Sequence, residues 1–450
     1  MLRGILASVL GALALAGTAP AAVTGWLTFG NDASRSGFVP EGVADPAALH
    51  EIWAATLDGR ITTQVLVARD VPEPGQLTLY VGTSRGILYA LNENGFERGR
   101  RQLGAMRLKN CEFLPDGQFG ITGAPAIDPR TATIYVTDAL GFAHALDLIT
   151  LEERVGWPVR LYTDSWARLT WGAVTLVKGR LFVGTGELCR RDVASGKLFS
   201  IDLRTRAVRV WTPTPALEGG GSGIWGWGGP SYDARSDSLL VTTGDAYQYG
   251  KNKGKAFTES AGLAEHVVSL DRNLHVLASH SPLDYREPVD SDFSGTPIVI
   301  RAPGCPALVA GENKNGFIYL WRLERIGEGL FGSVRVAAKL NGQPAWSPRT
   351  RSLYVGGHKR LYRLALTPKC RLRIAWSVPL GVESVNGPPT IAGDVVWFPA
   401  TDTLAIWAVH ARTGKVLWKG SMGEPVYTAP TVIDGRVYAG GFSGVVKSFG

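Results

Sequence analysis

Six residues in the central part of the chain have side chains suited to binding a metal ion and a flat organic group. They are Glu187, Trp225, Trp227, Asp245, Asp292 and Lys314. Carboxylates are the hard oxygen ligands that Ca²⁺ requires, and a bound Ca²⁺ acts as a Lewis acid on a neighbouring carbonyl. An indole offers a stacking surface to a flat heterocycle, and an ammonium donates hydrogen bonds to its oxygens. One remaining carboxylate can accept the proton of an alcohol.

Each of these residues lies beside a short strand-like segment. Glu187 follows RLFVGTG, and Asp245 follows LLVTTG. Asp292 lies in DSDFSGTP, and Lys314 lies in the turn-like segment NKNG. Acidic residues at loop tips also shape turns, and Lys-Asn-Gly is a good hairpin turn. Taken singly, each residue is therefore open to a purely structural interpretation.

An internal repeat predicts the elements that position these residues. Its clearest copies lie at 78–92, 124–147 and 429–449, and each alternates apolar and polar residues at period two, as strands do. The units begin near Thr62, Ile121, Gly172, Trp225, Phe293, Gln343, Gly387 and Val426. One such sheet cannot bury both of its faces alone, so neighbouring units must stack. We therefore predict an all-β fold, an eight-bladed β-propeller over residues 23–450.

The last repeat ends before it can supply an outer strand. The strand-like segment 49–57 precedes the first complete unit and is otherwise unassigned. We expect it to close the ring as the outer strand of the last blade, which removes an exposed sheet edge.

The repeat also predicts that the six residues share one face. If the strands of each blade are labelled A to D from the axis outward, the loops from D to the next A and from B to C emerge on the same side. Glu187, Asp245 and Lys314 fall in B–C loops, whereas Trp225 and Asp292 fall at D–A entries. Convergence on one site follows from this placement.

A tryptophan recurs near the end of the predicted outer strand. The best copy is ARTGKVLW at 411–418, with shorter versions ending at Trp211 and Trp376. This repeat resembles the tryptophan-docking repeat of the pyrroloquinoline quinone (PQQ)-dependent alcohol dehydrogenase family. The alternative is that these tryptophans only form the core between blades.

The resemblance extends to the candidate site. It implies that Glu187 and Asp245 bind Ca²⁺, with Asp245 in place of the asparagine that ends the family's Gly-Thr-Gly-Asn motif. Trp225 or Trp227 would support PQQ, Lys314 would contact it, and Asp292 would serve both as catalytic base and as a metal ligand. The resemblance thus implies a PQQ- and calcium-dependent dehydrogenase that oxidises an alcohol or a sugar.

One departure from the family weakens this interpretation. Dehydrogenases of the family often have adjacent cysteines followed by an arginine that binds the carboxylates of the cofactor, and here GITG at 120–123 takes that place. The alternative function is a non-catalytic propeller of the same superfamily, a scaffold or a binding module.

The first 22 residues have the layout of a secretory signal peptide: Arg3, an apolar run to Ala16, and small residues up to Ala22. No cysteine follows the run to accept a lipid. We predict a secreted, periplasmic or cell-surface protein with no stable membrane span after cleavage, the alternative being an uncleaved anchor. No CxxCH haem motif occurs, so electrons would pass to a separate acceptor.

A net charge of +8 is compatible with an anionic partner. No Lys/Arg run or basic helix concentrates that charge, so we interpret it as a solvated basic surface and expect no nucleic-acid partner.

Four cysteines in an exported chain indicate disulfides, and three complete pairings are open. The predicted loop faces favour Cys111 with Cys189 and Cys305 with Cys370.

Overall fold

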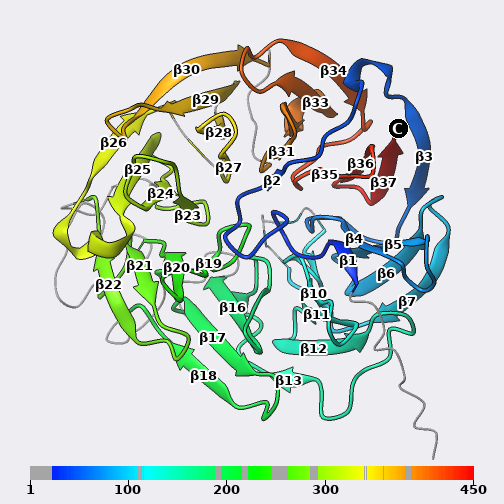
Figure 1. Ribbon diagram of the computed structural model, residues 1–450. Coiled ribbons are helices and arrows are strands. Elements are labelled where there is room, and N and C mark those ends of the chain that lie inside the picture. The colour runs from blue at the N-terminus through cyan, green and yellow to red at the C-terminus, as the bar shows by residue number, and fades with distance from the viewer. Residues whose placement is uncertain are drawn as a thin grey trace, which may run out of the picture.

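The computed structural model describes residues 23–450 except 110, 112–113, 115, 188–193, 215–220, 246–261, 284–291, 339, 341, 358 and 381–386. The described residues form eight sheets, antiparallel except for one short parallel pair, arranged radially around one axis (Figure 1). Each sheet has four strands from axis to rim, and some have an additional short strand. The predicted eight-bladed β-propeller is confirmed.

The strands of the first four blades run outward from the axis in chain order. Blade 1 has β4 (Leu66–Arg69), β5 (Leu77–Gly82), β6 (Ile87–Asn92) and β7 (Glu97–Gln102). Blade 2 has β10 (Ala126–Asp128), β11 (Thr133–Thr137), β12 (Phe142–Asp147) and β13 (Val159–Arg160). Blade 3 has β14 (Arg168–Leu169) and β15 (Thr175–Val177), both paired with β16 (Arg180–Glu187), then β17 (Lys197–Asp202) and β18 (Val208–Trp211). Blade 4 has β19 (Ser231–Asp233), β20 (Ser238–Thr242), β21 (Val267–Leu270) and β22 (Val276–His280).

The remaining blades repeat the same order. Blade 5 has β23 (Ile298–Ile300), β24 (Leu308–Glu312), β25 (Phe317–Arg322) and β26 (Gly332–Arg335), with the short helix η3 (Leu323–Glu328). Blade 6 has β27 (Ala345–Ser347), β28 (Ser352–Gly357), β29 (Arg360–Leu366) and β30 (Leu372–Pro379). Blade 7 has β31 (Thr390–Ala392), β32 (Val395–Ala400), β33 (Ala405–His410) and β34 (Val416–Ser421), with η4 (Thr401–Thr403). Blade 8 has β35 (Thr431–Ile433), β36 (Arg436–Gly440) and β37 (Val445–Phe449). A small ribbon of β8 (Met106–Arg107) and β9 (Gln118–Phe119) joins blades 1 and 2.

The ring closes as the repeat predicted. Strand β3 (Glu51–Thr56) pairs with β37 and forms the outer strand of blade 8, after the short helix η1 (Pro46–Ala48). Trp418 donates its indole hydrogen to the carbonyl of Leu49 at 2.8 Å and fixes the chain where it enters this strand.

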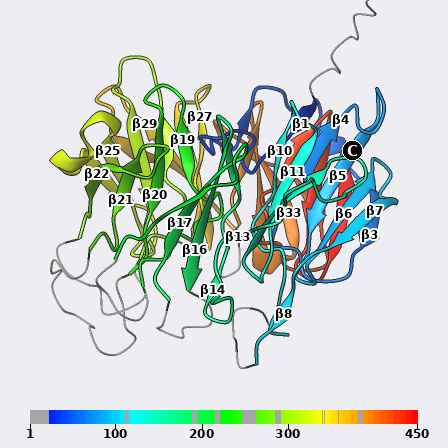
Figure 2. The ribbon, with the colours of Figure 1, turned by 90° about the horizontal axis from the view of Figure 1, so that it is seen from below.

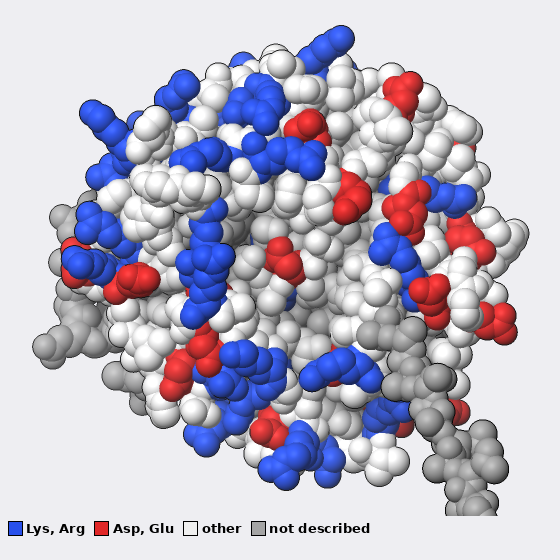
Figure 3. Space-filling view, in the orientation of Figure 1, with Lys and Arg blue, Asp and Glu red and all other residues white. Residues whose placement is uncertain are grey.

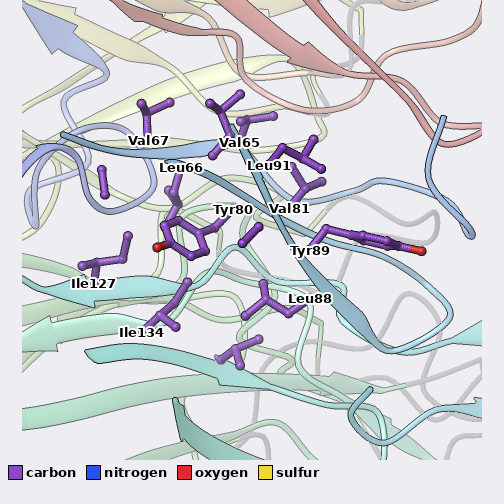
Figure 4. Packing of buried hydrophobic residues seen from close by; sticks show 14 of the residues in the cluster. Val65, Leu66, Val67, Tyr80, Val81, Leu88, Tyr89, Leu91, Ile127 and Ile134 are labelled. Atoms are coloured by element: carbon purple, nitrogen blue, oxygen red, sulfur yellow. The ribbon is translucent and has the colours of Figure 1, made fainter. Parts of the chain in front are cut away.

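Apolar side chains fill the space between neighbouring blades. Figure 4 shows Leu66 of β4 and Tyr80 of β5 near Ile127 and Ile134 of blade 2. Tyr80 is fully buried, and its hydroxyl donates to the carbonyl of Leu148 at 2.5 Å. Stacking of one sheet on the next therefore buries the faces that no single blade can bury alone.

Residues 23–42, which we name the axial segment, fill the central channel. Its strand β1 (Thr24–Trp26) pairs with β4, and β2 (Phe38–Val39) runs parallel to β31. Between them, the carbonyls of Ala33 and Ser36 accept hydrogen bonds from blades 4 and 6, each at 2.8 Å. The segment crosses the centre of the ring in front of the blades (Figure 1). It enters beside the A–B turns, whereas β8 and β14, which belong to D–A connections, lie toward the opposite end of the molecule (Figure 2).

Arg35 anchors the axial segment. Its side chain is 1% exposed and donates to the Thr28 hydroxyl at 2.6 Å and the Phe29 carbonyl at 3.0 Å. Its other terminal nitrogen reaches blade 3, at the carbonyl of Val174 (3.1 Å) and the hydroxyl of Thr175 (2.6 Å). Burial lowers the pKa of Arg35 to about 10, although Asp32 acts in the opposite direction.

One predicted disulfide is present. Cys305 and Cys370 are bonded with their Cα atoms 5.6 Å apart, and they join an A–B turn of blade 5 to a C–D turn of blade 6. In the other predicted pair, of Cys111 with Cys189, Cys189 lies outside the described residues. The signal peptide at 1–22 lies outside them as well and stays a prediction. None of the helices in the described ranges is long and apolar enough to cross a bilayer.

A buried histidine in blade 2 makes folding stability depend on pH. His144 contacts Glu153 at 2.8 Å through Nδ1 and Asp138 at 3.2 Å through Nε2. Burial alone would lower the pKa of His144, but the hydrogen bonds to both carboxylates raise it from 6.5 to about 9. The protonated ring therefore stabilises the fold fully below pH 6.5, and this contribution is lost as the pH rises through 9.

We expect the free energy of unfolding to fall by on the order of 2 kcal/mol between pH 6.5 and 9 because of His144. Urea unfolding across this range measures the slope. In the His144→Gln variant, whose side chain cannot titrate, the free energy of unfolding should no longer fall over this pH range. If it falls as steeply as in the parent, His144 is not the cause of the pH dependence.

Candidate functional site

Three of the predicted site residues form one compact group. The ammonium of Lys314 lies 2.6 Å from Oδ1 of Asp292, and the indole nitrogen of Trp225 donates to Oδ2 at 3.2 Å. The same ammonium lies over the indole, 4.5 Å from the ring centroid. Asp292 is 3% exposed. Both oxygens of a buried carboxylate are thus held, one by a cation and the other by an indole.

The hairpin of blade 5 sets the distance between Asp292 and Lys314. The backbone nitrogen of Lys314 donates to the Asp292 carbonyl at 2.9 Å, and the following Phe293 forms a β-bridge with Asn313. Gly316 has a φ of 94°, which the tight turn between β24 and β25 requires. The predicted B–C turn at NKNG is confirmed, and it brings the ammonium to the strand entry.

Three glycines let the backbone approach Trp225 and Asp292 closely. A Cβ on Gly223 would lie 2.9 Å from Cδ1 of Trp225, and one on Gly244 would lie 2.8 Å from Oδ2 of Asp292. A Cβ on Gly186 would lie 3.1 Å from the Trp225 Cβ. Gly186 and Gly244 directly precede Glu187 and Asp245. The backbone at both predicted calcium ligands therefore lies beside the group.

The structure does not bring all the predicted metal ligands together. Within the described ranges, no three or more His, Cys, Asp and Glu side chains form a group that could hold a metal ion. The expected convergence of Glu187, Asp245 and Asp292 on one volume is thus not seen there. In the sheet, Glu187 is paired in register with Arg168 of β14. The calcium site stays a prediction.

The two predicted cofactor tryptophans have different surroundings. Trp227 packs near the axis against the apolar cluster that contains Phe29, at the tip of the axial segment. Its carbonyl accepts a hydrogen bond from Ala173 at 3.0 Å. Of the two, only Trp225 touches Asp292 and Lys314 through the contacts described above, so Trp225 is the one that belongs to the group.

Two buried charged residues near the site were not predicted. Arg168 is 3% exposed; it donates to the Asp164 carboxylate at 3.0 Å and to the Thr185 hydroxyl at 3.3 Å. Burial acts to raise the pKa of Asp164, but the hydrogen bond from Arg168 lowers it overall. Arg168 lies in the two-residue strand β14, and no sequence motif identifies a single arginine there.

Glu312 is the second residue that sequence reasoning missed. It is fully buried at the end of β24, and burial raises its pKa to about 7 even though Gly342 and Ser294 donate to Oε1 at 2.7 and 3.2 Å. Its Oε2 has no hydrogen-bond partner among the described residues. Glu312 follows an apolar strand segment, LVAG, so the sequence does not distinguish it from an ordinary residue at the end of a strand.

The group fits an organic quinone better than it fits a calcium ion. An indole, a cationic donor and a buried carboxylate are contiguous, as a flat, oxygen-rich heterocycle with an alcohol beside it would need, and the Lys314 ammonium covers one face of that indole. The glycine cradle leaves room for no further side chain at Oδ2 of Asp292. By contrast, the several oxygen ligands that Ca²⁺ requires are not assembled by the described residues.

The fold defines a class of protein: an eight-bladed propeller of the type found in quinoprotein alcohol dehydrogenases. The quinohemoprotein alcohol dehydrogenase of Pseudomonas putida superposes with a TM-score of 0.73 at 16% identity, covering 94% of this chain and 80% of that one. A europium-containing methanol dehydrogenase gives a TM-score of 0.69 at 14% identity over 94% of this chain and 98% of its own. At such low sequence identities, these superpositions establish the fold alone.

A family model of the repeat matches part of the chain. Residues 330–447 match the PQQ_2 family model, described as outer membrane protein assembly factor BamB. The structure of BamB from Moraxella catarrhalis superposes with a TM-score of 0.58 at 14% identity, covering 89% of this chain and 97% of that one. The comparison with curated protein sequences gave no match. The predicted resemblance to PQQ-type propellers is confirmed.

Proposed function

We propose that this chain is an exported quinoprotein dehydrogenase that oxidises a small alcohol or a sugar. The observation that carries the proposal is the Asp292 carboxylate held between the Lys314 ammonium and the Trp225 indole. PQQ, when bound, supplies the two-electron oxidant. Trp225 would support its ring, Lys314 would donate to a quinone oxygen, and Asp292 would accept the hydroxyl proton of the substrate.

The metal ligands and the electron acceptor in this proposal are inferred from the sequence. The sequence proposes Glu187, Asp245 and Asp292 as ligands of Ca²⁺, although among the described residues these carboxylates do not form a metal-binding group. Bound there, Ca²⁺ would polarise a neighbouring carbonyl. Because the sequence has no CxxCH motif, electrons would leave to a separate acceptor.

Reconstitution tests this proposal. We expect the chain from residue 23 to retain PQQ through gel filtration in the presence of Ca²⁺, seen as quinone absorbance, and to reduce a dye with at least one member of a panel of alcohols and sugars. Chelation of Ca²⁺ should abolish dye reduction. Trp225→Leu should weaken PQQ binding about tenfold, because the stacking surface is lost.

The second candidate function is a non-catalytic propeller that acts as a scaffold. The match of residues 330–447 to the BamB model favours it, as does GITG in place of the cofactor-binding arginine. If the chain fails to retain PQQ with or without Ca²⁺, the dehydrogenase proposal is wrong and the scaffold function replaces it.

A further inference from the structure

The positive charge of this protein is concentrated in one blade. Residues 343–380, which form blade 6, contain six arginines and two lysines and no aspartate or glutamate. The other 39 basic residues, 47 less these eight, equal the 39 acidic residues of the chain. Blade 6 therefore accounts for the whole net charge of +8.

Six exposed or half-buried cations form what we name the basic patch, on the A–B and C–D turns and the outer strand of blade 6 and on the adjoining turn of blade 7. They are Arg349, Arg351, Lys369, Arg371, Arg373 and Arg412. In Figure 3, blue side chains gather over this region, around β26, β29 and β30, with few red ones among them. The patch lies on the face opposite to the B–C loops that hold the candidate site.

Carboxylates do not neutralise the basic patch. Among the described residues, one acid pairs with it, Asp394 with Arg349 at 3.8 Å. Backbone carbonyls accept hydrogen bonds from two of the guanidinium groups instead. Arg351 donates to the carbonyl of Pro303 at 2.8 Å, and Arg412 donates to the carbonyl of Arg349 at 3.2 Å. The cations are thus ordered while their charge stays available to an external anion.

A recess and two exposed aliphatic side chains accompany the charge. A cavity of about 310 Å³, lined by Pro303, Gly304, Arg351, Leu366 and Pro368, opens within the patch. At its outer edge, Leu330 is 41% exposed and Ile374 is 42% exposed. Exposed apolar side chains beside a cluster of basic ones are typical of surfaces that lie on anionic bilayers.

We infer that the basic patch docks the protein onto an anionic phospholipid surface. Guanidinium groups bind the headgroup phosphates, Arg351 receives one of them in the recess, and Leu330 and Ile374 enter the interfacial layer. In this orientation the candidate site faces away from the bilayer, toward soluble substrates.

The contacts favour lipid over nucleic acid. Single-stranded nucleic acids are held by open aromatic rings on which bases stack. Phe331, an aromatic ring beside the patch, has Arg371 over it at 3.6 Å and Arg322 at 4.8 Å, measured to the ring centroid. Both guanidinium groups cover the ring, so it offers no stacking platform.

Vesicle co-sedimentation of the chain from residue 23, which contains every strand of the closed ring, tests the inference. We expect binding to vesicles of phosphatidylglycerol and phosphatidylcholine, loss of that binding as salt is raised, and none to phosphatidylcholine alone. The variant Lys369→Gln/Arg371→Gln/Arg373→Gln should bind on the order of 100-fold more weakly.

A matched control removes the same charge from the outer strand of blade 1. Arg98→Gln/Arg100→Gln/Arg101→Gln lies on β7, where Arg98 and Arg100 already pair with Glu93 and Glu97 at 3.4 and 3.5 Å. This control should bind within about threefold of the parent, because paired surface charges contribute little. Should the triple variant melt early, Lys369→Gln/Arg373→Gln leaves Arg371 on Phe331 and serves in its place.

Three results would overturn the inference: no sedimentation with anionic vesicles, equal losses in the blade 6 and blade 1 variants, or binding to polyglutamate without binding to vesicles. The last result would identify an acidic protein as the partner. None of these readouts depends on PQQ or on dehydrogenase activity.

Discussion

Asp292→Asn is expected to lower dye-linked oxidation of the substrate by roughly 10²- to 10⁴-fold, because an amide cannot accept the hydroxyl proton. PQQ binding should change by only a few fold, since Trp225 and Lys314 remain in place. Steady-state rates and a PQQ titration measure the two effects separately.

The control for this variant is Asp434→Asn. Asp434 is an exposed carboxylate on the opposite face, where it pairs with Arg69 at 2.6 Å, so the same chemical change should leave turnover unaltered. A variant that binds PQQ and keeps full turnover would remove Asp292 from the role of base. Loss of both binding and turnover, with normal thermal unfolding, would instead assign the residue to cofactor binding.

Arg35→Ala is expected to lower the free energy of unfolding by about 3 to 5 kcal/mol. The substitution removes the donor of three buried acceptors and one half-buried acceptor, and it opens a cavity between the axial segment and blade 3. Urea unfolding followed by tryptophan fluorescence measures the loss.

Arg130→Ala provides the comparison for Arg35→Ala. The side chain of Arg130 is 70% exposed and its partner Asp128, at 3.2 Å, is 3% exposed, so its removal should cost no more than about 1 to 2 kcal/mol. If Arg35→Ala is no more destabilising than Arg130→Ala, the axial segment contributes little to the stability of the ring.

The blades were predictable because each one repeats a local pattern. Alternation at period two and turn residues fix a strand within a few neighbours, so the eight units and the closing strand 49–57 could be placed from sequence. The axial segment could not. Its hydrogen-bond partners come from inner strands spread over most of the chain, and no local periodicity records them.

The charge of blade 6 was missed for a related reason. Its basic residues alternate with apolar ones along strands, as in RLYRLAL and KCRLRI, so no contiguous run marks them. Only the fold, which sends alternate side chains to opposite faces and brings turns together, gathers these cations into a patch.

The candidate site was predicted in part. The rule that B–C and D–A loops share a face was enough to bring Trp225, Asp292 and Lys314 together. Where the carboxylates of Glu187 and Asp245 point depends on loops whose conformation the repeat does not specify. Glu312 and Arg168 were missed because burial, rather than residue type, makes them notable.

The pairing of β3 with β37 has a consequence for synthesis. The outer strand of the last blade lies near the beginning of the chain and must wait for residues 445–449, so a ribosome has to make nearly the whole protein before the ring can close. Contacts between such distant segments slow folding. Until residues 445–449 have been made, β3 has no partner strand in the last blade, so closure of the ring is among the last events of folding.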